Sequence, residues 1–263
     1  MRINWILTAI LGLTISGCAG VQTAPTQEER QALAPTGKLR AAFFANQPVH
    51  ATKDPVTGEL KGVAMDLGNE MARRLGVPLE LVTYRTAVEL VNSAQTGQWD
   101  IIFLGIVPAR AKTVDFSAPY AQIEMGYLVA KGSSISVISE VDRPGVRIAV
   151  LEKGASDVLL TSTLKSATLV RYPTVAAAVE SFRAGNADAL VSIKTFLIPA
   201  SEKVPGSRIL EGRISVEYIG IGVPKGHNVS ATYVRQFVDD VKSQGFVKEA
   251  IEKAGVRGLM AAP

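Results

Sequence analysis

Segments with a strand pattern and segments with a helix pattern alternate along the chain from residue 37 to residue 255. In the segment 62–75, for example, apolar residues recur every four positions from Val63 to Leu75, which is the spacing of one face of a helix. Short apolar runs between such segments are typical of buried strands. This alternation predicts an α/β fold built of βα units, with mainly parallel sheets flanked by helices.

The limits of these elements follow from the apolar runs and from the Gly and Pro residues between them. We expect strands at residues 38–44, 78–84, 99–105, 125–131, 147–151, 168–172, 189–193, 208–210 and 214–223. We expect helices at residues 62–75, 87–95, 156–164, 174–184 and 229–255, the last one broken at Gly245. Ligands of such sheets bind at the carboxyl ends of the strands. The candidate binding loops therefore follow Phe44, Tyr84, Gly105, Leu151, Tyr172 and Ile193.

The composition excludes several classes of protein. Of the 263 residues, 47% are hydrophobic and 20% are charged, which is typical of a globular chain and not of a disordered one. One Cys and two His residues exclude a disulfide framework, a zinc cluster and a His-rich metal site, so we expect no cofactor. The net charge of +4 comes without a stripe of Lys and Arg, which argues against a nucleic-acid partner.

The N-terminus has the pattern of an export signal. Arg2 precedes an apolar run at residues 5–15, which is too short to span a bilayer and is typical of the core of a signal peptide. The run ends in Ile-Ser-Gly-Cys18, which resembles a bacterial lipobox. This resemblance implies removal of residues 1–17 and lipidation of Cys18, and hence a periplasmic protein anchored to a membrane by lipid. The alternative is an ordinary secretory signal with an incidental Cys.

The segment that follows the signal has the composition of a tether. Residues 18–36 are rich in Ala, Thr, Pro and Gln. We expect this segment to bury little surface and to be mobile, with a helical turn at residues 27–33.

Five sequence blocks occur in order along the rest of the chain. They are GELKGVAMDL at 58–67 with RRLGV at 73–77, GQWDII at 97–102, Arg110 with VDFSAPY at 114–120, VRIAV at 146–150 with Gly154, and AGNADA at 184–189. In this order and spacing the blocks resemble those of the family 3 extracellular solute-binding proteins, the receptors of polar amino-acid ABC importers. The resemblance runs from about residue 37 to residue 255. Each block alone is weak evidence for the family, whereas five blocks in this order and spacing are specific evidence for it.

The resemblance implies a two-lobed periplasmic binding protein fold of type II that closes on a small solute and catalyses no reaction. Lobe 1 would comprise residues 37–122 and 219–263, and lobe 2 residues 123–218. The two hinge crossings would lie near residues 123–125 and 217–219. The resemblance also implies an ABC permease in the inner membrane as the partner, and we expect the binding protein to be a monomer.

Arg110 is the first candidate ligand-binding residue, because it follows the predicted strand 99–105. A guanidinium there can make bidentate, charge-assisted hydrogen bonds to a carboxylate. The resemblance assigns this Arg to the carboxylate of the ligand, so we expect a small anionic solute. The alternative is a surface Arg that pairs with Asp115. Gly105 and Phe103 end the same strand, and Phe103 either covers an apolar part of the ligand or packs in the core.

Two further pairs of candidate residues lie just after predicted strands. Ala155 and Ser156 open a helix whose free amides favour an anion, although the Ser156 hydroxyl can instead cap that helix. Asn46 and Gln47 follow the first strand, where the family has a loop that flanks the ligand. Their alternative is a polar turn.

One departure from the family pattern bears on the ligand. The amino-acid receptors usually carry an Asp eight residues after the Gly that here is Gly185, and this Asp pairs with the ammonium group of the ligand. Ile193 occupies that position and Lys194 follows it. With Lys194 as a second anion contact, the ligand would be a carboxylate without a free α-amino group. Alternatively, Lys194 is solvated at the start of the next helix, or Glu124 or Glu217 replaces the missing Asp.

An enzyme with the same fold is the alternative function. Some proteins of this fold are periplasmic dehydratases, and Lys194 with Glu124 or Glu217 would then act as acid and base. Against this, the sequence contains no evident Ser-His-Asp or Cys-His set and no metal-ligand or phosphate-loop motif. We therefore expect binding without catalysis.

Overall fold

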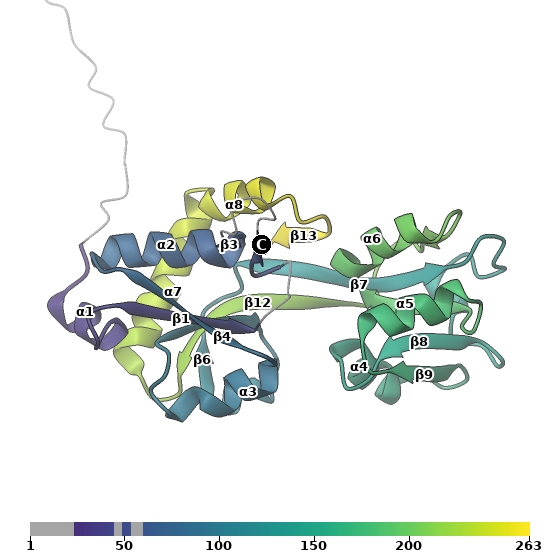
Figure 1. Cartoon of the computed structure of the whole chain (residues 1–263), viewed down its shortest axis with the longest axis horizontal. Helices are drawn as coiled ribbons and strands as arrows, with labels where there is room; N and C mark the ends of the chain where they lie inside the picture. Colours follow the sequence, from purple (N-terminus) through teal and green to yellow (C-terminus); the bar gives the residue numbers. More distant parts are fainter. Residues whose placement is uncertain (1–23, 45–48, 54–59) are drawn as a thin grey trace, which may run out of the picture.

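The computed structural model describes residues 24–44, 49–53 and 60–263. The chain forms two bodies joined by a pair of long strands, β7 (Ala121–Val129) and β12 (Ser215–Pro224) (Figure 1). We call the body that contains residues 24–44, 60–116 and 228–261 lobe 1, and the body that contains residues 138–209 lobe 2. In the described part of the chain, no helix is both long enough and apolar enough to cross a membrane.

The remaining elements alternate between helix and strand over most of the chain. The helices are α1 (Gln27–Leu33), α2 (Val63–Leu75), α3 (Ala87–Asn92), α4 (Ala155–Thr163), α5 (Val175–Arg183), α6 (Lys194–Lys203), α7 (Asn228–Ser243) and α8 (Phe246–Ala254), with 3-10 turns η1 (Ser93–Gln95), η2 (Arg110–Lys112) and η3 (Ile138–Glu140). The other strands are β1 (Leu39–Phe44), β2 (Thr52–Lys53), β3 (Leu60–Lys61), β4 (Leu79–Tyr84), β5 (Ile101–Gly105), β6 (Val114–Phe116), β8 (Arg147–Leu151), β9 (Thr168–Tyr172), β10 (Ala189–Ile193), β11 (Arg208–Ile209) and β13 (Leu259–Ala261).

One mixed sheet runs through both lobes in the order β4-β1-β5-β12-β7-β10-β8-β9, with β6 beside β12 and β11 and β13 beside β7. Parallel pairs join β1 to β4 and β5, and β8 to β9 and β10. The crossing strands are antiparallel to every partner, so the expected predominance of parallel pairs is not found at the centre. The reason is that β7 carries the chain out of lobe 1 and β12 carries it back.

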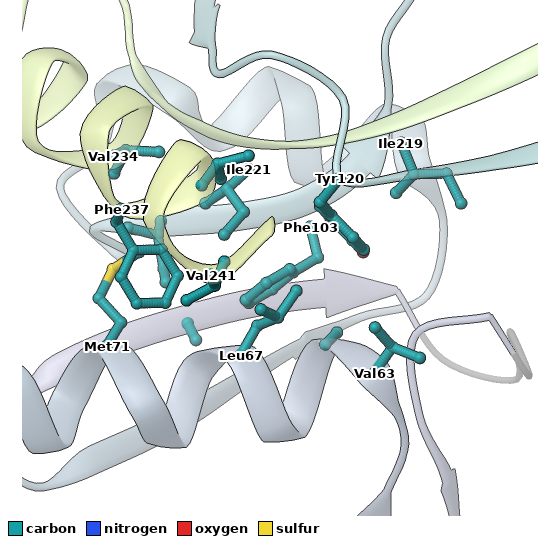
Figure 2. Packing of buried hydrophobic residues seen from close by; sticks show 14 of the residues in the cluster. Val63, Leu67, Met71, Phe103, Tyr120, Ile219, Ile221, Val234, Phe237 and Val241 are labelled. Atoms are coloured by element: carbon teal, nitrogen blue, oxygen red, sulfur yellow. The ribbon is translucent and has the colours of Figure 1, made fainter. Parts of the chain in front are cut away.

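The core of lobe 1 lies between the sheet and the helices α2, α7 and α8. Leu67 and Met71 of α2 face Phe237 and Val241 of α7, with Phe103 of β5 beside them (Figure 2). These side chains are almost completely buried. Burial of each one contributes about 1.5–3 kcal/mol. Lobe 2 has its own clusters on the two faces of its sheet, one beneath α4 and one beneath α5 and α6.

Helix α1 belongs to the packed part of the molecule. Thr26 and Glu29 form a capping box, in which the Glu29 N–H donates to Thr26 Oγ1 (3.2 Å) and the Thr26 N–H donates to Glu29 Oε2 (2.7 Å). Leu33 is fully buried in the lobe 1 core, and α1 contacts α7. The expectation that residues 18–36 bury little therefore does not hold for this helix.

Some elements differ from those that the sequence patterns indicate. Strand β7 begins at Ala121, four residues before the expected start, because it continues from lobe 1 across the hinge. Helix α6 begins at Lys194, as the alternative for that residue supposed, but its limits were not predicted because Pro199 lies inside it and interrupts the helical pattern. Strand β13 is only three residues long and gains its pairing from β7, so no local pattern indicates it.

The Gly-x-x-Asp sequence plays the same structural role in both lobes. In lobe 1 the Asp100 carboxylate accepts hydrogen bonds from the backbone N–H of Arg40 (2.8 Å) and from its guanidinium (2.6 Å). In lobe 2 the Asp188 carboxylate accepts the same two bonds from Arg147 (2.8 and 3.0 Å). Each Asp thus ties the start of a strand to its neighbour, as expected for a structural residue.

Candidate ligand-binding site

A cavity of about 260 Å³ lies between the two lobes. Gly105 and Arg110 reach it from the end of β5, and Glu217 reaches it from the crossing strand β12. Ala155 and Ser156 reach it from the start of α4 in lobe 2. The cavity therefore joins residues from three separate parts of the chain, at the strand ends where α/β sheets place their ligands.

Arg110 points its guanidinium into this cavity from the turn η2. Its Nη1 donates a hydrogen bond to the backbone carbonyl of Gly105 (2.6 Å). Among the described residues, no carboxylate lies within 4 Å of the guanidinium. Asp115, the alternative partner considered from the sequence, pairs instead with Lys225 (2.9 Å). Burial lowers the pKa of Arg110, and the negative charge of Glu217 opposes this effect.

Glu217 faces Arg110 across Gly105. A Cβ atom on Gly105 would lie 2.5 Å from Glu217 Oε1 and 3.1 Å from Arg110 Nη1, so only glycine leaves room for both groups at this point. Burial raises the pKa of Glu217, and the charge of Arg110 lowers it by a smaller amount. No Lys or Arg nitrogen of the described chain lies within 4 Å of the Glu217 carboxylate. Two opposite charges thus border the cavity without forming an ion pair.

The start of α4 presents backbone amides to the cavity. The first hydrogen bond of this helix runs from the Val158 N–H to the Gly154 carbonyl (3.0 Å), which leaves the amides of Ala155 and Ser156 without a partner inside the helix. The Ser156 hydroxyl does not cap the helix, and it donates instead to Met125 Sδ (3.7 Å). Unpaired amides at a helix N-terminus favour a negative group.

His50 also borders the cavity, although the sequence analysis did not select it. Its side chain is buried, and burial together with the charge of Arg110 lowers its pKa to about 4. The imidazole is therefore neutral at neutral pH. A single His in a loop gives no sequence signal for this position, since only the fold brings it near Arg110.

The rest of the cavity wall is mostly apolar. Ile123 and Ile219 come from the two crossing strands, and Val191, Ile193 and Phe196 come from β10 and α6. Ile193 was named from the sequence only because it occupies the position of an expected Asp. Ile123 and Ile219 were not named as site residues, because which face of a crossing strand borders the cavity depends on the tertiary structure.

Two residues proposed from the sequence lie elsewhere. Phe103 is 1% exposed and packs edge-to-face on Tyr120 in the lobe 1 core, at 6.2 Å between ring centres (Figure 2). Lys194 donates from Nζ to Glu124 Oε2 (2.6 Å), and it is not among the residues that border the cavity. Asn46 and Gln47 fall outside the described residues, as does Cys18.

In the described part of the chain, no group of three or more His, Cys, Asp or Glu side chains is placed to hold a metal ion. The described residues around the cavity offer recognition by the Arg110 guanidinium, the Lys153 ammonium, the Glu217 carboxylate, free backbone amides and a largely apolar wall.

Known proteins share this architecture. The chain is 24% identical over 245 residues to a glutamine-binding protein of Geobacillus stearothermophilus, which covers 84% of this chain and 92% of that protein. A putative binding component of an ABC transporter from Wolinella succinogenes, solved in complex with lysine, superposes with a TM-score of 0.72 at 25% identity, covering 82% of this chain and 95% of that one. An ancestral amino-acid-binding protein, described as a precursor of cyclohexadienyl dehydratase, superposes with a TM-score of 0.69 at 26% identity, covering 85% of this chain and 97% of that one.

These similarities confirm the expected type II periplasmic binding protein fold. The family model for bacterial extracellular solute-binding proteins, family 3, matches residues 40–256, which is most of the chain. The same segment contains the cavity and both crossing strands. The chain therefore belongs to the bacterial extracellular solute-binding proteins of family 3.

Proposed function

We propose that the protein is the substrate-binding component of an ABC importer, and that it binds an α-amino acid in the cavity between the lobes with the carboxylate on Arg110. Membership of the family implies a small-molecule ligand, an ABC permease as the partner and a location outside the cytoplasm. Among the related proteins, one is named for glutamine and another was solved with lysine.

The position of Arg110 is the observation that carries this proposal. A guanidinium that is partly withdrawn from water and has no carboxylate within 4 Å among the described residues is a site for an incoming anion. The amides of Ala155 and Ser156 face the same cavity from lobe 2. A ligand carboxylate between Arg110 and these amides would join the lobes, which is how a two-lobed receptor is stabilised in its closed form.

The expectation of a ligand without an α-amino group rested on Ile193 in the place of the expected Asp and on Lys194 as a second anion contact. In the structure the Lys194 ammonium is engaged by Glu124 and lies outside the cavity wall. Ile193 borders the cavity, but Glu217 borders it as well and offers a carboxylate in place of the missing Asp. We therefore propose an α-amino acid and not a simple carboxylate.

Calorimetry of the purified protein with the twenty standard amino acids tests this proposal. We expect binding of at least one of them, and a ligand at 100 times its Kd should add about 2.7 kcal/mol of stability, or roughly 5–10 °C in Tm. Arg110→Met should weaken binding by at least about 100-fold. Arg213→Met is the matched control, because Arg213 pairs with Glu124 outside the cavity and its loss should leave binding unchanged. Unchanged binding in Arg110→Met would contradict the proposal.

The anchoring and domain assignments also remain proposals. We propose that residues 1–17 are removed, that Cys18 is lipidated, and that the periplasmic monomer has lobe bounds of 37–122 with 219–263 and of 123–218. Mass spectrometry of the mature N-terminus tests the lipidation. An unmodified or uncleaved Cys18 would contradict it.

A dehydratase is the second candidate, and one observation favours it. Glu217 is a carboxyl group with a raised pKa beside an apolar cavity, as a general acid would be. The ancestral structural neighbour is described as a precursor of such an enzyme. Lys194 and Glu124, the other residues considered for this chemistry, pair with each other away from the cavity. Consumption of a bound cyclohexadienyl acid, followed by chromatography, would favour the enzyme over the receptor.

A further inference from the structure

We propose that Glu217, on the crossing strand β12, binds the ammonium group of the ligand and so selects α-amino acids without a cationic side chain. This inference rests on the proposed function, because it takes Arg110 as the site of the ligand carboxylate. It assigns the ammonium contact to the hinge strand and not to the end of β10, where Ile193 stands.

Strand geometry directs Glu217 into the cavity. Successive residues of a strand point to opposite faces of the sheet. Glu217 and Ile219 both border the cavity, whereas Tyr218 between them is 41% exposed on the other face. On the neighbouring strand, Ile123 pairs with Glu217 in register and also borders the cavity. The carboxylate is thus held by the middle of the sheet and not by a loop.

The surroundings of Glu217 favour a cation supplied by the ligand. It is the only carboxylate among the cavity-lining residues that the structure describes. Removal of a carboxylate from water is unfavourable unless it is paired, and no described Lys or Arg lies within 4 Å. Burial correspondingly raises the pKa of Glu217. An ammonium group placed beside it would restore the missing partner.

The spacing of the two charges suits one zwitterion. Arg110 Nη1 and Glu217 Oε1 both approach the same point above Gly105, yet they stay more than 4 Å apart. A ligand that carries a carboxylate and an ammonium on one carbon can therefore contact both groups without displacing an existing ion pair. The glycine at position 105 leaves open the space that this arrangement requires.

The remaining wall offers no partner for a cationic ligand side chain. Val175, Val191, Ile193 and Phe196 present apolar surface from lobe 2, and Lys153 adds a positive charge to the wall. With Glu217 engaged by the α-ammonium, the described wall offers no second carboxylate for the side chain of lysine or arginine. His50 is neutral at neutral pH and adds no negative charge.

The test compares Glu217→Gln with its matched control Glu124→Gln by calorimetry on the purified full-length protein. The probes are the twenty standard L-amino acids and the des-amino acid that corresponds to the tightest binder. Glu217→Gln should weaken the amino acid by about 30-fold and the des-amino acid by less than about threefold. Glu124→Gln should leave both affinities as in the wild type. Glu217→Asp, which keeps the charge, should recover part of the loss.

The outcomes separate this inference from the proposed function. Loss of binding in Arg110→Met with unchanged amino-acid binding in a folded Glu217→Gln would overturn the role of Glu217 alone. Equal or tighter binding of the des-amino acid by the wild type would overturn it as well. Lysine or arginine as the tightest ligand would overturn the selection against cationic side chains. If no standard amino acid binds, both proposals fail.

Discussion

Two glutamates on the crossing strands have opposite surroundings. Glu124 of β7 accepts hydrogen bonds from Lys194 (2.6 Å) and Arg213 (2.9 Å), and these contacts lower its pKa. Glu217 of β12 lies one step away in the register, yet it borders the cavity, has no described Lys or Arg within 4 Å, and has a pKa raised by burial.

The difference follows from which face of the sheet each side chain occupies. Glu217 pairs with Ile123 and Val216 pairs with Glu124, so the two carboxylates project to opposite faces of the same pair of strands. On one face, cations from α6 and from the loop before β12 neutralise the Glu124 carboxylate. On the other face, we expect the ammonium group of a ligand to neutralise the Glu217 carboxylate. One carboxylate therefore stabilises the hinge, and the other remains available for recognition.

The largest expected effect comes from placing a methyl group beside Glu217. Gly105→Ala puts a Cβ 2.5 Å from Glu217 Oε1, so the carboxylate must move away, and amino-acid affinity should fall by about 100-fold. The fold should survive, because the atom displaced is the end of a flexible side chain. Gly126→Ala is the control on the Glu124 side, where the nearest atom is Lys194 Cε at 3.8 Å. If calorimetry gave the two variants equal affinities, the proposal that only the face with Glu217 binds the ligand would be contradicted.

The pH dependence of affinity should distinguish the two glutamates next. Glu217 binds an ammonium group only when ionised, and its raised pKa means that protonation begins at a higher pH than for an ordinary Glu. Below this pKa, affinity for an amino acid should fall by up to about tenfold per pH unit. The charged or titratable groups that face Glu217 are Arg110, Lys153 and His50, and the pKa of His50 is about 4.

Calorimetry over a pH series measures this dependence. Glu217→Gln should remove the fall in affinity that protonation of Glu217 causes, and Glu124→Gln should keep the wild-type profile. A wild-type profile in Glu217→Gln would show that another group controls the binding.

Glu217→Gln and Glu124→Gln should change the stability of the ligand-free protein in opposite directions. The folded-state pKa of Glu217 is raised, so its ionisation destabilises the folded protein once the pH exceeds its unfolded pKa, and Glu217→Gln should stabilise the ligand-free protein by about 1 kcal/mol at pH 7. The folded-state pKa of Glu124 is lowered, so its contribution is present above its unfolded pKa and is lost as the pH falls through the folded pKa. Glu124→Gln should destabilise by about 0.5–1 kcal/mol at pH 7.

Urea unfolding at pH 7 and at pH 3.5 measures both changes. The increase in the free energy of unfolding caused by Glu217→Gln should be smaller at pH 3.5, because the wild-type carboxyl group is then protonated in both the folded and the unfolded state. Destabilisation by Glu217→Gln at pH 7 would mean that the carboxylate has a cation partner in the ligand-free protein.

The smallest effect is expected at Lys194. Lys194→Met removes one of the two cations on Glu124, but Arg213 stays, so the loss of stability should be about 0.5 kcal/mol. Amino-acid affinity should not change, because Lys194 does not border the cavity. A tenfold loss of affinity in calorimetry would restore Lys194 as a ligand contact.

The sequence was most informative where a local pattern controls local structure. Helices α2 and α5 and strands β8, β9 and β10 lie within a residue or so of their predicted limits, because apolar spacing and flanking Gly or Pro residues control such elements. Gly105 and Arg110 were also chosen from the sequence, since Gly105 ends a buried strand and Arg110 follows that strand in a motif of the family. Strand β13 was not predicted, and no limits were predicted for helix α6, which contains Pro199, because tertiary pairing and packing stabilise these elements.

The choice among charged residues could not be made from the sequence. Lys194, Glu124 and Glu217 were all candidates for the site, and each lies near a hinge crossing. Their separation depends on the register between β7 and β12, which no local pattern encodes. His50 was missed for the same reason, since its proximity to Arg110 is a long-range contact.

The α/β class, the family, most of the elements and the strand that precedes Arg110 are predictable from the sequence, because these depend on periodicity and on motifs within short segments. The tertiary structure alone decided which carboxylate faces the cavity, which lysine is neutralised at the back of the hinge, and which apolar side chains form the wall. These outcomes depend on the pairing of strands that lie about 90 residues apart in the chain, as in the register of Glu217 with Ile123. Such pairing is selected by the packing of the whole molecule.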